Sequence, residues 1–112
     1  MSACSDSPAK VLTVHAWQVI VTASCARRDL YDLRTNAVIP QTIRPWLSSL
    51  GTTSGGESLW ITDVPNTHRI TVAVASGRVV VLPRMEPTHA AQRRSAEDFF
   101  AALWEQLARY AG

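Results

Sequence analysis

The stretch of sequence that decides the fold is His68–Arg84, which reads HRITVAVASGRVVVLPR. Two runs rich in β-branched residues flank the dipeptide Ser76-Gly77. β-branched residues favour strands, and glycine accepts the positive φ angle that a two-residue hairpin turn requires. The stretch therefore predicts a β-hairpin with Ser76-Gly77 as its turn.

The predicted register divides the side chains of the hairpin between two faces. A two-residue turn places Val72 opposite Val81, within an apolar face that another element must cover. The same register places Arg69 directly opposite Arg84. Two like charges in this position repel each other unless an anion lies between them, which makes the pair a candidate site for a small anionic ligand or an acidic partner. The alternative is that the two arginines point into solvent, or are neutralised by Glu57, Asp63 or Glu86.

Other segments are expected to add strands to this hairpin. Segment 10–24 is rich in Val, Ile, Thr and Trp, which favours one strand with two largely apolar faces. A helix with Pro8 in its first turn is the alternative. Segment 57–62 is expected to form a strand that the turn at 63–67 joins to the main hairpin. Segment 25–40 is left open between a loop, a short turn of helix and a weak edge strand.

Two amphipathic segments predict helices. Within Ser95–Tyr110, apolar residues recur at three- and four-residue spacing, and the Ser-Ala-Glu-Asp start has the form of a capping box. We expect this helix to cover the apolar face of the sheet, each large side chain that it buries contributing about 2 kcal/mol. Segment 40–50 favours a short helix that Pro45 limits. The Gly-rich segment 51–58 lacks the spacing of a phosphate-binding loop and predicts a flexible connector.

Together these patterns predict an α+β domain with an antiparallel sheet of about four strands, a C-terminal amphipathic helix packed on one face and one short additional helix. Residues 1–112 are 46% hydrophobic, which suffices for a single domain with its own core. Residues 1–9 are small and polar and predict a loose N-terminal arm. The apolar run 11–21 is too short to span a bilayer and makes a poor signal peptide, so we expect a cytoplasmic protein without membrane contact.

Metal and nucleic-acid binding are not expected. Neither Cys4 nor Cys25 lies at metal-ligand spacing, and no pair of histidines does, so we predict no metal site and no cofactor. The net charge of +2 is too small to imply nucleic-acid binding by itself, and both Arg-Arg dipeptides have acids nearby.

Aromatic and imidazole side chains complete the candidate site. Trp17 and Trp60 fall on predicted strands, where their indole N–H groups need partners, and we expect them to line a pocket or a subunit interface. No catalytic residue is predicted. The residues predicted to bind a ligand or an anion are Arg69, Arg84, His68, Trp60, Trp17 and His15.

The second face of the predicted sheet leads to the expected function. It carries apolar residues that the rest of the chain, with one short helix, cannot cover. We therefore expect a non-enzymatic protein-interaction or small-ligand-binding module, a small bacterial accessory protein that forms a homodimer. The alternative is a small enzyme whose site, at the end of the sheet, combines His15 or His68 with Cys25, Asp63 or Arg69. A weak nucleic-acid-binding protein is the third possibility.

Overall fold

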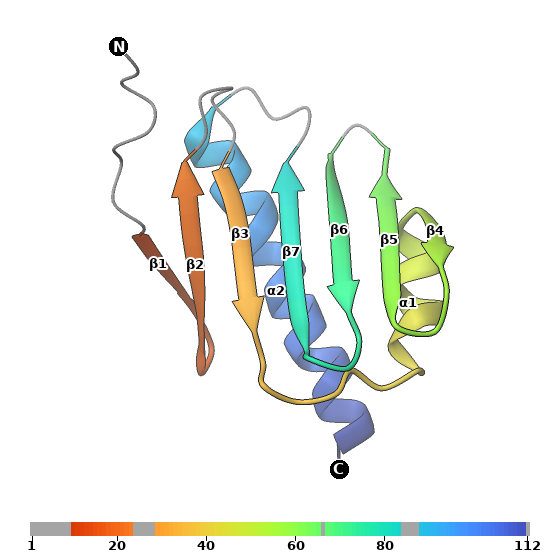
Figure 1. The fold of residues 1–112 in the computed structure, drawn as a ribbon. Helices are drawn as coiled ribbons and strands as arrows, with labels where there is room; N and C mark the ends of the chain where they lie inside the picture. The colour runs from red at the N-terminus through yellow and green to blue at the C-terminus, as the bar shows by residue number, and fades with distance from the viewer. Residues whose placement is uncertain (1–9, 24–28, 66, 84–87, 112) are drawn as a thin grey trace.

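A computed structural model describes residues 10–23, 29–65, 67–83 and 88–111. Its elements are β1 (Lys10–Val14), β2 (Trp17–Ala23), β3 (Asp29–Arg34), α1 (Ile43–Leu50), β4 (Thr52–Gly55), β5 (Leu59–Val64), β6 (His68–Ala73), β7 (Arg78–Pro83) and α2 (His89–Ala111). The strands form one antiparallel sheet in the order β1-β2-β3-β7-β6-β5-β4, and both helices lie behind it in Figure 1. The predicted α+β class and the placement of the C-terminal helix are confirmed.

The prediction of about four strands is wrong, because the sheet has seven. Segment 10–24 is not one strand: it folds into the β1–β2 hairpin, whose turn holds His15 at a φ angle of 54°. Without glycine, proline or asparagine, this turn leaves no signal in the sequence. Segment 25–40, left open above, supplies the inner strand β3, and the predicted connector 51–58 contains the edge strand β4.

The hairpin within residues 68–84 forms, but its turn holds four residues instead of two. Ala73 is paired with Arg78, and Gly77, with a φ angle of 71°, donates its N–H to the Ala73 carbonyl at 3.0 Å. The pairing stops there because the backbone of Val74 bonds elsewhere. Its N–H donates to the Ser58 carbonyl at 2.9 Å, and its carbonyl accepts from a loop N–H at 2.9 Å.

The predicted pairing of Arg69 with Arg84 is therefore wrong. Arg69 lies opposite Leu82, and Arg84 falls outside the described residues. The displacement is by two residues, and since side chains alternate with a period of two, each one keeps its predicted face. Val72 now lies opposite Val79 and still faces the helices.

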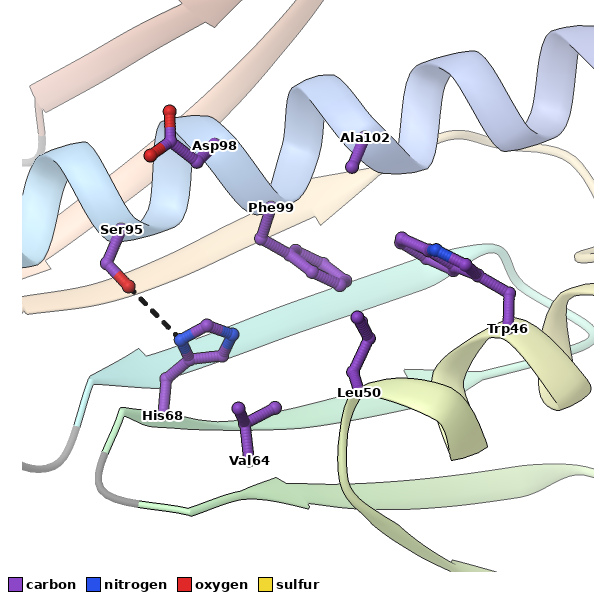
Figure 2. Close-up of a pocket in the computed structure, with 8 residues that line it drawn as sticks. All are labelled: Trp46, Leu50, Val64, His68, Ser95, Asp98, Phe99 and Ala102. Atoms are coloured by element: carbon purple, nitrogen blue, oxygen red, sulfur yellow. Dashed lines mark hydrogen bonds between the residues drawn. The ribbon is translucent and has the colours of Figure 1, made fainter.

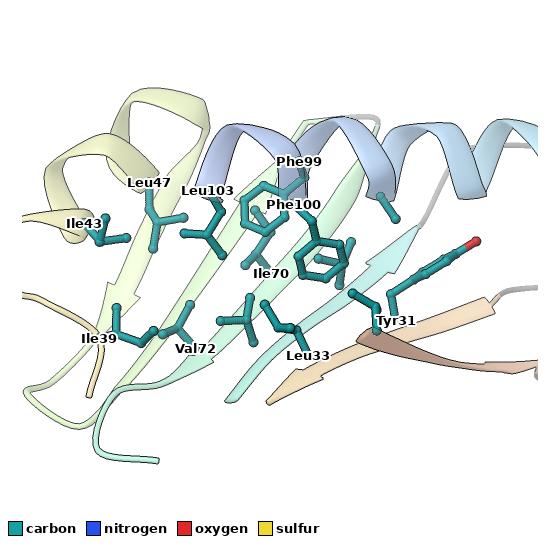
Figure 3. Close-up of a cluster of buried hydrophobic side chains, with 14 of the residues drawn as sticks. Tyr31, Leu33, Ile39, Ile43, Leu47, Ile70, Val72, Phe99, Phe100 and Leu103 are labelled. Carbon is teal, nitrogen blue, oxygen red and sulfur yellow. The ribbon is translucent and has the colours of Figure 1, made fainter. Parts of the chain in front are cut away.

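The core lies between the sheet and the two helices (Figure 3). Phe100 and Leu103 of α2 and Leu47 of α1 are at most 2% exposed. They pack against side chains from the inner strands, among them Leu33, Ile70 and Val72 (Figure 3). The predicted apolar stripe of the C-terminal helix is thus the one that covers the sheet.

The two helices differ from the prediction in where they begin. α1 begins at Ile43, inside the predicted segment 40–50, so Pro45 falls in the first turn, where backbone N–H groups have no partner within the helix. α2 begins at His89, and Thr88 caps it: Thr88 Oγ1 accepts the N–H of Ala91 at 3.1 Å. The capping box predicted at Ser95 is wrong, because Ser95 lies inside the helix.

Several expectations fall on residues that the structure leaves undescribed. They are the N-terminal arm at 1–9, the absence of a metal site at Cys4 and Cys25, and the anion-binding role of Arg84. Within the described residues, neither helix is long and apolar enough to span a bilayer.

Candidate functional site

The face of the sheet turned away from both helices is called the open face here. Its side chains alternate along each strand with those of the core. Val11, Ile20 and Leu59 on this face are 57%, 41% and 45% exposed. The open face includes the side chains of Val11, Ile20, Asp32, Arg34, Leu59, Ile61, Asp63, Arg69, Thr71, Arg78, Val80 and Leu82.

Two arginines do lie directly opposite each other on this face, but they are Arg34 and Arg78. Asp32 stands between them. Arg78 donates from Nε and Nη2 to both carboxylate oxygens, at 3.0 and 2.9 Å, and Arg34 Nη2 lies 3.7 Å from Oδ2. The hydrogen bond and the charge of Asp32 raise the pKa of Arg78. The anion that such a pair requires is thus supplied by the chain itself.

Arg69, a predicted anion ligand, also has an acidic partner. Its Nε donates to Asp63 Oδ1 at 3.0 Å, and both side chains are more than 40% exposed. Arg69 therefore binds an acidic residue of its own chain, Asp63, where the sequence had suggested an external anion. Because Arg84 lies outside the described residues, anion binding by the two arginines stays a prediction.

The two tryptophans predicted to line a site have different roles in the structure. Trp60 is fully buried in the core, and its Nε1–H donates to the Gly56 carbonyl at 3.0 Å. Trp17 is half-buried and packs edge-on against Trp104 of α2, with ring centroids 4.9 Å apart. His15 stacks on Trp104 with ring centroids 5.0 Å apart, and its residue is exposed.

A pocket opens on the helix-covered side of the sheet, between α1, α2 and the β5–β6 hairpin (Figure 2). Its volume is about 300 Å³. This α1–α2 pocket is lined by Trp46, Leu50, Val64, His68, Ser95, Asp98, Phe99 and Ala102. Of the predicted site residues that the structure describes, His68 alone is among them.

His68 and Ser95 form the polar part of the α1–α2 pocket. The Nδ1 atom of His68 and the Oγ atom of Ser95 lie 3.2 Å apart. Burial lowers the pKa of His68, so the imidazole is neutral at neutral pH. Its ring meets Phe99 edge-on at 5.8 Å, and Phe99 in turn stacks on Trp46 with centroids 5.6 Å apart.

The arrangement resembles part of a nucleophilic site without completing one. Asp98 lines the same pocket as His68 and Ser95, but in Figure 2 its carboxylate is turned away from the imidazole. Ser95 lies in the interior of α2, where backbone N–H groups are bonded within the helix and cannot stabilise an oxyanion. Among the described residues, no group of three or more His, Cys, Asp and Glu side chains could hold a metal ion.

Sequence reasoning missed most of this pocket. Ser95 was interpreted as a helix cap, and Trp46 and Phe99 as members of apolar stripes, which they also are. One signal was available. If the second helix is extended back to His89, Ser95 lies inside it, next to the buried Ala96, instead of capping its start. Its contact with His68 joins positions 27 residues apart and has no local pattern.

Comparisons of the chain with protein-family models, with curated proteins and with solved structures give no match.

Proposed function

We propose that the protein is a non-enzymatic interaction module that forms a homodimer through the open face of its sheet. The observation that carries this proposal is a single row of side chains that crosses the open face from β1 to β5. Its members are consecutive cross-strand partners: Val11, Ile20, Asp32, Val80, Thr71 and Ile61. Four of these six are aliphatic, and the one carboxylate is already paired with Arg78.

The size of the open face suits a dimer. Strands lie about 4.8 Å apart and rise about 3.3 Å per residue, so a seven-stranded sheet of this kind presents an area of roughly 30 by 20 Å. This projected area is of the same order as the roughly 800 Å² that each partner of a standard interface buries. Two sheets packed face to face bury their facing side chains in a layer about 10 Å thick.

A second copy fits this surface better than an acidic or basic partner would. A two-fold axis that runs along β7 lays β2 of one copy over β5 of the other, since β7 is the middle strand. The apolar row then covers itself, with Ile20 of each copy near Ile61 of the other. Asp32 and Asp63 have arginine partners within their own chain. Dimerisation would therefore leave neither carboxylate buried without a counter-charge.

Catalysis is the second candidate function, favoured by the contact between His68 and Ser95. The position of Ser95 inside α2 and the orientation of Asp98 supply neither an oxyanion hole nor an acid that orients the imidazole. The pocket therefore supports binding better than acyl transfer.

Sedimentation velocity from about 1 to 200 μM tests the dimer. We expect the wild-type chain to sediment as a dimer in the upper part of this range and Ile20→Lys, which places a charge in the apolar row, as a folded monomer. Val38→Lys is the matched control, because Val38 is 67% exposed but lies in the loop between β3 and α1. A wild-type monomer at 200 μM, or dissociation by Val38→Lys as well, would show the proposal to be wrong.

A further inference from the structure

We propose that the α1–α2 pocket binds a compact, uncharged molecule that has an apolar body and one hydroxyl or amide-type group. The pocket is lined by residues of both helices (Figure 2), and both helices lie on the side of the sheet opposite the open face (Figure 1). The proposal is therefore independent of the association described above, and either can fail without the other.

The apolar body is inferred from the lining. Aromatic and aliphatic side chains make up most of the wall: Trp46, Leu50, Val64, Phe99 and Ala102. Pockets for small molecules hold roughly 300–1,000 Å³ and are mainly apolar with a few polar groups. At about 300 Å³ this pocket is at the lower limit, which restricts the ligand to about the size of one substituted ring.

The single polar group of the ligand is inferred from His68. Ser95 occupies Nδ1 of the imidazole, and the other ring nitrogen is turned toward the middle of the pocket in Figure 2. A neutral imidazole has one donor and one acceptor nitrogen, so Nε2 either donates to a ligand or accepts from it. A hydroxyl group can both donate and accept a hydrogen bond, so it suits either tautomer. An amide has an N–H that donates to one tautomer and a carbonyl oxygen that accepts from the other.

The charges around the pocket exclude ionic ligands. Among the described residues that line the pocket, none is Lys or Arg, and burial keeps His68 neutral, so a carboxylate would lose its hydration without gaining an ion pair from them. An ammonium group would find only Asp98, whose side chain is exposed and turned outward in Figure 2. An exposed partner of this kind contributes little. An uncharged ligand has neither cost.

An NMR titration of the full ¹⁵N-labelled chain with four probes that share a ring tests the class of ligand: benzyl alcohol, toluene, benzoate and benzylamine. We expect benzyl alcohol to shift the amides of Trp46, His68 and Phe99 saturably, with a Kd in the millimolar range typical of such small probes. It should bind about fivefold more tightly than toluene, which lacks the hydrogen bond, and about tenfold more tightly than either ion.

Variants assign these shifts to the pocket. Ala102→Leu fills the cavity and should abolish saturable shifts with every probe. His68→Phe keeps the apolar volume and should remove the preference for benzyl alcohol over toluene. His15→Phe, at the exposed β1–β2 turn, should behave as wild type.

Three outcomes would overturn the proposal, each in variants shown to be folded by circular dichroism. They are the absence of saturable shifts with all four probes, binding of benzoate or benzylamine as tight as that of benzyl alcohol, and a preference for the alcohol that survives in His68→Phe.

Discussion

At the scale of single residues, Asp32 shows how one carboxylate can organise a polar cluster on an otherwise apolar face. Its side chain is 11% exposed, while those of Arg34 and Arg78 are 63% and 46% exposed. The carboxylate is thus nearly buried, and the two guanidinium groups that it holds remain hydrated. Such a cluster keeps like charges on adjacent strands from repelling each other.

Asp32→Asn removes the negative charge and should lower the free energy of unfolding by about 1–2 kcal/mol, because the hydrogen bonds of Arg78 lose their charged acceptor. Urea denaturation at low salt measures this loss. Arg69→Ala is the control: it breaks an exposed ion pair and should change stability by less than about 0.5 kcal/mol. Equal losses in the two variants would contradict the role assigned to Asp32.

His68 should make stability depend on pH. Its pKa in the folded chain is lowered by burial from the ordinary value of 6.5, so below pH 6.5 the unfolded chain binds a proton that the folded chain does not. Stability is therefore complete above pH 6.5 and falls as the pH decreases through the window between the unfolded and the folded pKa. Thermal melts from pH 7.5 to pH 5 should show a steeper fall of Tm in wild type than in His68→Gln. An unchanged slope in His68→Gln would refute the assignment.

At the scale of elements, the turn between β6 and β7 decides the register of the sheet's centre. Gly77 has a φ angle of 71°, and its carbonyl accepts hydrogen bonds from the N–H and the hydroxyl group of Thr35, at 2.9 and 3.0 Å. The turn therefore connects the hairpin to the loop after β3, which brings β3 beside β7. A turn that the sequence indicates locally therefore also makes a tertiary contact with the loop after β3.

Gly77→Ala should lower the free energy of unfolding by about 2–4 kcal/mol. An alanine at this position would have to adopt a positive φ angle, and its Cβ would collide with the Ala37 carbonyl and the Thr35 hydroxyl. Urea denaturation tests this, with Ser76→Ala as the neighbouring control. Ser76 is exposed, and its loss should cost less than about 0.5 kcal/mol. A Gly77→Ala variant as stable as Ser76→Ala would show that the turn is not constrained.

At the scale of the whole molecule, the sheet separates two surfaces with different chemistry. One side carries the helices, the core and the α1–α2 pocket, and the other is the open face with its apolar row. An antiparallel sheet can expose one face to water, but such a face is normally polar. The aliphatic side chains of the open face, with Ile20 and Leu59 more than 40% exposed, are the reason to expect a second copy there.

Features of the fold that are determined by residues close together in the sequence could be predicted, and features that depend on residues far apart in the sequence could not. The inward-facing residues of β6 and β7 and the apolar stripe of α2 were predicted correctly, since each follows from alternation or from helical spacing within one segment. β3 was left open between a loop, a short turn of helix and a weak edge strand, because the charged residues of segment 25–40, Asp29 and Asp32 among them, gave it the character of a loop. Their partners are distant in sequence: Asp29 donates its N–H to Gln92, and Asp32 accepts from Arg78.

The sequence by itself determined the α+β class, the two helices and the division of side chains between the faces of the central hairpin, because periodicity and turn residues act locally. Only the tertiary structure decided the register, the number of strands and the pocket. The backbone of Val74 bonds to Ser58 and Ile39 instead of extending the ladder, and Ser95 meets His68 across two elements. Hydrogen bonds between segments far apart in the chain choose among local alternatives that nearby residues leave close in free energy.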